Sequence, residues 1–206
     1  MILNRLKHET AAEHGAVEAQ LDLLGRLGSL DDYRQLLACL WGFYAPFEQL
    51  LGAGPDWARF DVDIAQRLKA PALARDLQAL GLAPAALAAL PRCRALPTPT
   101  SFAHRLGCMY VLEGATLGGQ LIAREVRARL GLSPEHGCAF FASYGDQVGP
   151  MWRAFRALLL RAAVDAAAEA DMVRGAHATF AAFGQWVGAY AHDEHYDRPA
   201  DRSDQL

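Results

Sequence analysis

The sequence lacks the features that would tie it to nucleic acid or to a membrane. Charged residues make up only 21% of its 206 residues, the formal net charge is −3, and Lys and Arg form no run. A chain without a basic patch offers no electrostatic footprint for a phosphate backbone. Apolar runs are interrupted by Arg, Gln or Gly before they reach the roughly 18–20 residues that cross a bilayer. We therefore expect no nucleic-acid partner and no membrane span.

Cysteine is scarce, and its spacing matches neither paired metal ligands nor a disulfide framework. The N-terminus enters polar, helix-like sequence at once, without the apolar segment and small-residue cleavage site of a secretory signal. These observations predict a cytoplasmic protein with reduced thiols in its core. The four cysteines are Cys39, Cys93, Cys108 and Cys138.

Strand-like alternation of apolar and polar residues is also rare. Apolar residues instead recur every three or four positions, and Ala and Leu dominate many segments. With 52% hydrophobic residues the chain has ample material for one core. The sequence predicts an all-α fold with one domain over residues 1–196 and a polar tail over 197–206.

Caps and helix breakers delimit the predicted helices. Ser29 and Asp32 resemble a capping box, Pro46 should bend the helix that follows, and Pro71 should divide another. Gly131 should end a long glycine-containing helix. The predicted helical segments are 2–24, one from Ser29 that includes Pro46, 64–80 in two pieces, a short one after Pro84, 101–130, 151–168 and 169–191.

His14 is the first candidate for chemistry, because it lies on the apolar stripe of the first predicted helix, between Thr10 and Val17. A buried imidazole needs a partner. One interpretation is a core histidine that is hydrogen-bonded to a neighbour, and the other is a metal ligand. Glu18 lies one turn further on, where its carboxylate can accept one imidazole proton and leave the second nitrogen for a metal.

Three glycines, Gly114, Gly118 and Gly119, fall inside the predicted helix 101–130. An interior glycine destabilises a helix by about 0.5–1 kcal/mol relative to alanine. No strand precedes these glycines, which argues against a dinucleotide-binding turn. Two interpretations remain: close packing of another helix, or a flat ligand lying against bare backbone.

Taken together, two motifs resemble the haem oxygenases, particularly the bacterial ones associated with bacteriophytochromes. The resemblance implies a haem between a proximal and a kinked distal helix, with the iron ligated by the histidine of the first motif and dioxygen crowded by the glycines of the second. Glu18 would orient His14, and Gly114, Gly118 and Gly119 would form the distal wall. The motifs are Leu6-Lys7-x-x-Thr10-x-x-x-His14-x-x-x-Glu18 and Tyr110-Val111-Leu112-Glu113-Gly114-Ala115-Thr116-Leu117-Gly118-Gly119-Gln120.

The resemblance also implies partners for the rest of the haem. Lys7 and Arg156, with Arg153 as a second arginine candidate, would bind the propionates; the alternative for each is a solvated charge. Phe180 would flank the ring, although Phe180 and Phe183 also fit a core pair.

The implied activity is O2-dependent cleavage of haem to biliverdin, carbon monoxide and ferrous iron, with haem as substrate and as its own oxygen-activating cofactor. No flavin or nicotinamide motif is present, so electrons should come from a ferredoxin or reductase. A bacteriophytochrome would receive the biliverdin. Ala115 stands where many members carry an aspartate, which leaves Thr116, Gln120 and Asp146 as candidates for organising distal water. Two alternatives are a non-catalytic haem sensor or carrier and a thiaminase-like helical enzyme with a cysteine nucleophile.

Overall fold

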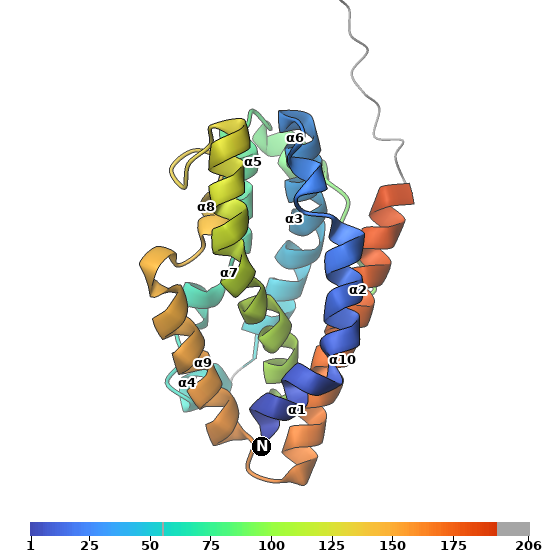
Figure 1. Ribbon diagram of the computed structural model, residues 1–206. Coiled ribbons are helices and arrows are strands. Elements are labelled where there is room, and N and C mark those ends of the chain that lie inside the picture. The colour runs from blue at the N-terminus through green and yellow to red at the C-terminus, as the bar shows by residue number, and fades with distance from the viewer. Residues whose placement is uncertain (55, 193–206) are drawn as a thin grey trace, which may run out of the picture.

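The computed structural model describes residues 1–54 and 56–192, and within them every regular element is a helix (Figure 1). The predicted polar tail lies outside the described residues. No helix in the described part of the chain is long and apolar enough to cross a membrane. The elements are α1 (Ile2–Glu9), α2 (Ala11–Leu21), η1 (Gly25–Leu27), α3 (Leu30–Gly52), α4 (Asp56–Arg59), η2 (Ile64–Arg67), α5 (Ala70–Ala79), α6 (Pro84–Ala89), α7 (Phe102–Leu130), α8 (Ala139–Ala142), η3 (Gly145–Gln147), α9 (Val148–Ala162) and α10 (Ala166–His192).

Local hydrogen bonds cap the starts of α3 and α7, and a glycine ends α7. The Ser29 hydroxyl accepts a hydrogen bond from the Asp32 backbone N–H at the start of α3. The Ser101 hydroxyl does the same for His104 at the start of α7. Gly131 ends α7 with a φ of 69°, a left-handed conformation that glycine adopts without steric penalty.

Two predicted boundaries are wrong. The first helix is interrupted at Thr10, whose φ and ψ of −104° and 9° depart from helical values and whose hydroxyl donates to the Leu6 carbonyl oxygen. The last two helices meet at residues 163–165, earlier than expected. There the Asp165 carboxylate accepts from the Ala168 N–H, so the alanines after it begin α10 instead of ending α9.

The long helix α10 packs against both α7 and α2, as Figure 1 shows. A Cβ atom added at Gly107 would lie 1.8 Å from the Met172 carbonyl oxygen, and one at Gly175 would lie 2.1 Å from that of His104. The backbones of α7 and α10 therefore touch directly, which only glycine allows. Because α2 also packs against α10, α10 fixes the position of α2, which bears His14, relative to α7, which bears the glycine motif.

Candidate functional site

The His14 side chain, on α2, is open to solvent. It is 56% exposed, although its stripe neighbours Thr10 and Val17 are buried, so the expectation of a buried imidazole is wrong. The Phe180 ring of α10 lies beside His14 in a T-shaped arrangement, with the ring centroids 5.9 Å apart. His14 Nδ1 lies 3.3 Å from Glu18 Oε2, which leaves Nε2 as the nitrogen available to a metal.

Two ion pairs hold the helices that carry this histidine. Glu13 Oε1 lies 2.6 Å from His177 Nδ1, and Arg5 NH1 lies 3.2 Å from Glu169 Oε2, so α2 and α1 are both tied to α10. A hydrogen bond from its own backbone N–H, with a further contribution from His177, lowers the pKa of the Glu13 carboxyl. Glu13 directly precedes His14, and the pair restrains the backbone from which the imidazole projects.

One face of α7 presents backbone and apolar side chains to open space. A Cβ atom added at Gly114 or Gly118 would meet no atom within 4 Å. Leu117 and Leu121 on the same face are 47% and 50% exposed. Gly119 differs, because its added Cβ would lie 2.7 Å from the Phe141 carbonyl oxygen. Two of the three predicted distal glycines thus border open space, whereas Gly119 permits close packing of α8.

Next to this face, α7 is anchored by a buried ionic cluster that the sequence did not reveal. Glu113 is fully buried; Lys69 Nζ and the Tyr144 hydroxyl donate to its Oε1, and Arg67 NH1 donates to its Oε2, each at 2.7 Å. Burial lowers the pKa of Lys69 and raises that of Tyr144. Glu48 completes the cluster by accepting from the backbone N–H groups of Lys69 and Ala70. The sequence signal was only that Glu113 stands inside the glycine motif.

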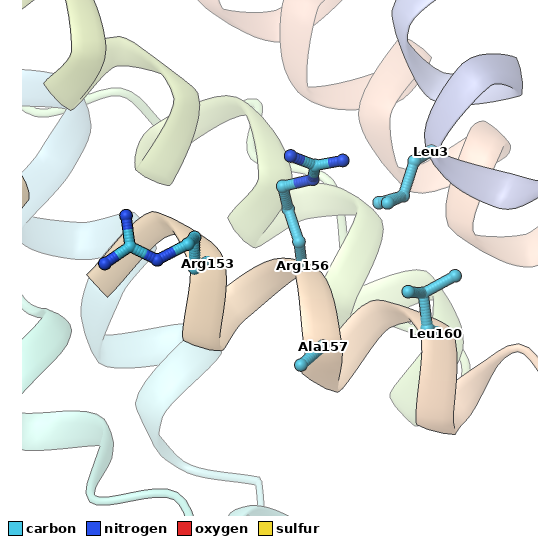
Figure 2. Close-up of a pocket in the computed structure, with 5 residues that line it drawn as sticks. All are labelled: Leu3, Arg153, Arg156, Ala157 and Leu160. Atoms are coloured by element: carbon cyan, nitrogen blue, oxygen red, sulfur yellow. The ribbon is translucent and has the colours of Figure 1, made fainter. Parts of the chain in front are cut away.

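Basic side chains lie at the mouth of a small cavity between α1 and α9. The cavity has a volume of about 210 Å³ and is lined by Leu3, Arg153, Arg156, Ala157 and Leu160. Figure 2 shows Arg156, Leu160 and Leu3 directed into this space. Lys7 and both arginines are exposed, and none of them forms an ion pair with another residue that the structure describes.

Two of the three polar side chains predicted to organise distal water form hydrogen bonds within the protein. The Thr116 hydroxyl donates to the Glu113 carbonyl oxygen and Gln120 Nε2 donates to that of Ala142, at 2.7 and 2.8 Å. Asp146 and Ala115 are exposed. The structure therefore directs the Thr116 and Gln120 side chains toward protein acceptors.

Other cofactor and nucleophile chemistries find little support. No cluster of three or more His, Cys, Asp or Glu side chains suited to a metal ion occurs within residues 1–54 and 56–192. All four cysteines are buried, and burial raises the pKa of Cys108 and Cys138 to about 11 each. A thiol with such a pKa is protonated at neutral pH, which argues against the thiaminase-like alternative.

The residues present fit a haem. The backbone at Gly114 and Gly118 borders open space, against which a flat macrocycle could lie. The exposed imidazole of His14 could supply a nitrogen ligand, and the Phe180 ring lies beside it. Unpaired guanidinium groups at the α1–α9 cavity suit carboxylates.

Comparison with known proteins agrees with this set of residues. The model of the family described as "Heme oxygenase" matches residues 1–189. A curated heme oxygenase from Xanthomonas campestris pv. campestris (strain 8004) is 38% identical over 165 residues, which cover 78% of this chain and 92% of that protein.

Solved structures show the same fold. The NO- and CO-bound heme oxygenase from Neisseria meningitidis superposes with a TM-score of 0.77 at 22% identity, covering 92% of each chain. Heme oxygenase from Leptospira interrogans gives a TM-score of 0.72 at 16% identity, covering 91% of this chain and 98% of that one. The predicted all-α, haem-oxygenase-like fold is confirmed, and the chain belongs to the haem oxygenase family.

Proposed function

We propose that this chain binds haem between α2 and the open face of α7, with His14 Nε2 as the iron ligand, and opens the ring to biliverdin, carbon monoxide and ferrous iron. The observation that carries the proposal is the exposed imidazole of His14, whose Nδ1 lies 3.3 Å from Glu18 Oε2 while its stripe neighbours are buried. The helix α10 contacts both α2 and α7, so it holds the two sides of the proposed haem site in a fixed relation.

The chain's own residues would divide the work as follows. Bound haem supplies the iron at which dioxygen is activated. Glu18, whose Oε2 lies 3.3 Å from His14 Nδ1, would accept the Nδ1 proton and so favour one tautomer and ring orientation of His14. An imidazole ligand from His14 would differ from a thiolate, which would favour early cleavage of the O–O bond. Gly114 and Gly118 let backbone and water approach the reacting centre closely.

At the edge of the ring, Lys7 and Arg156 would pair with the two propionates. Both side chains are exposed, and the α1–α9 cavity beside Arg156 is too small for a whole porphyrin, with a volume of about 210 Å³. It suits one edge of the macrocycle. Because exposed ion pairs contribute only about 0.2–1 kcal/mol each, these contacts would fix the rotation of the ring more than its affinity.

Electron supply and product use follow from the same proposal. A ferredoxin or reductase would deliver the electrons from outside the chain. The setting would be cytoplasmic, and a bacteriophytochrome would be a recipient of the biliverdin.

Titration of the purified protein with haemin tests the proposal. Wild-type protein should give the shifted Soret band of a histidine-ligated haem, and addition of dioxygen and a reductant should produce biliverdin absorbance. His14→Ala should lose the histidine-ligated spectrum and regain it with added imidazole. His8→Ala is a matched control, because His8 is exposed on α1 outside the motif positions.

Each contrary result has a distinct meaning. An unchanged spectrum in His14→Ala would reassign the ligand. Haem binding without product would identify a sensor or carrier, and the absence of any Soret shift in wild-type protein would refute both haem-based functions.

A further inference from the structure

The buried ionic cluster holds α7 at the residue that precedes the open face. Glu113 immediately precedes Gly114, and its carboxylate is held from two other segments: residues 67–69 around the start of α5, and Tyr144, which follows α8. The partners bind different oxygens of one carboxylate, so Glu113 cannot translate or rotate without leaving a buried charge unpaired. Breaking such a pair is strongly unfavourable in the interior.

The cluster combines two basic side chains, Arg67 and Lys69, with two acidic ones, Glu113 and Glu48, and all four are buried. Well-packed apolar residues of similar volume would stabilise an interior as well or better. The arrangement is therefore better explained by the fixed position that it gives α7 than by the free energy of unfolding.

A second contact restrains α7 further along its axis, at the C-terminal end of the glycine motif. The Phe141 carbonyl oxygen abuts Gly119, and Gln120 donates to the Ala142 carbonyl oxygen at 2.8 Å. The next residue, Ser143, has a φ of 48°, a left-handed conformation that is strained for a residue with a side chain. Tyr144 follows it and reaches Glu113, so one turn, residues 141–144, contacts both ends of the glycine motif.

The helix between the two contacts is locally deformable. Gly114 and Gly118 weaken it, and the Thr116 hydroxyl donates back to the Glu113 carbonyl oxygen, an arrangement that often bends helices. A deformable segment that is held at both ends adopts the position set by those ends.

We propose that Glu113, held by Lys69, Arg67 and Tyr144, is a positioning residue that sets how closely the backbone at Gly114 and Gly118 approaches the haem, and thereby which ring carbon is oxidised. The inference rests on the proposed function and extends it to the control of product. Glu113 touches no substrate in this scheme and acts through the helix that it anchors.

Two variants test the role at different severities. Tyr144→Phe removes one donor to Glu113 while Lys69 and Arg67 remain, and Glu113→Gln removes the charge. Glu125→Gln is the matched control, because Glu125 lies on the same helix and pairs with Arg129 at 3.0 Å on the surface. If Glu113→Gln does not fold, Tyr144→Phe carries the test alone.

The first readout is amide hydrogen exchange of the haem-free proteins. Exchange over residues 110–121 should be on the order of tenfold faster in Tyr144→Phe than in wild type, since a hydrogen bond to a buried charge is lost, and unchanged in Glu125→Gln. The second is the distribution of biliverdin isomers from haem-loaded protein. It should broaden in Tyr144→Phe and Glu113→Gln, whereas a loss of folded protein alone would lower the yield without altering the distribution.

Unchanged exchange in residues 110–121, or an unchanged isomer distribution in a folded Tyr144→Phe protein that turns over haem, would overturn the positioning role. Failure of the wild-type protein to bind or cleave haem would instead refute the proposed function, and is seen before any variant is compared.

Discussion

Replacing Gly118 by alanine should make the protein more stable and a poorer catalyst. The added methyl group meets no protein atom within 4 Å, and Gly118 is helical with an ordinary negative φ. The gain in helix propensity is therefore unopposed and amounts to about 0.5–1 kcal/mol. For a domain of this size that raises Tm by roughly 1–4 °C. The same methyl group projects from the face on which we place the substrate.

The matched variant is Gly119→Ala, one residue further along. Its Cβ would lie 2.7 Å from the Phe141 carbonyl oxygen, a backbone atom, so α8 or α7 must shift. Overpacking of this kind destabilises by about 1–3 kcal/mol, which outweighs or cancels the propensity gain. The unfolding free energies of the two alanine variants should thus differ by about 1–3 kcal/mol, with Gly118→Ala the more stable.

The assays are thermal unfolding of the haem-free proteins and turnover of haem by the loaded ones. A methyl group that intrudes on a fitted site costs about 1–3 kcal/mol, or roughly 10–200-fold in rate, so Gly118→Ala should turn over haem at least about tenfold more slowly than wild type. Equal destabilisation by the two substitutions would refute the assignment of open and packed faces. Wild-type turnover in Gly118→Ala would remove the substrate from this surface.

Three further predictions concern other parts of the chain. Burial lowers the pKa of His104, so as the pH falls through the ordinary histidine pKa of about 6.5 the unfolded chain takes up a proton that the native state does not. The free energy of unfolding measured in urea should therefore fall as the pH drops below about 6.5. His104→Gln should reduce this pH dependence, whereas His136→Gln, at an exposed position, should not. Ser29→Ala removes the cap of α3 and should lower the free energy of unfolding by about 0.5–2 kcal/mol in denaturant titrations; no loss would contradict the capping bond. Lys7→Ala combined with Arg156→Ala should weaken haemin binding only slightly but change the biliverdin isomer ratio on chromatography, and an unaltered ratio would place the propionates elsewhere.

Features that depend on a few neighbouring residues could be predicted from the sequence. The cap at Ser29, the start of α7 near Ser101 and its end at Gly131 are of this kind, because each involves groups within four residues of one another. The buried cluster could not be predicted in this way. Glu113 meets Lys69 and Arg67 across 44 and 46 positions of sequence, and nothing in either segment encodes the other.

Periodicity also had a limit at His14. The spacing of three and four correctly predicts that Thr10 and Val17 are buried. It does not show that His14, on the same stripe, is left exposed by the neighbouring helix. The identity of the motif residues was visible in the sequence; the exposure that makes His14 available to a metal was visible only in the packing of α10.

By itself, then, the sequence determined the helical class, the starts of several helices and the two motifs that mark the family, because propensity, capping and hydrophobic period act along the chain. Tertiary structure alone decided which glycines of one motif border open space and which admit a neighbour, since Gly118 and Gly119 are adjacent and chemically identical. It also decided which residues anchor α7 through Glu113. Those properties belong to surfaces in contact, and a surface exists only once segments distant in sequence have packed together.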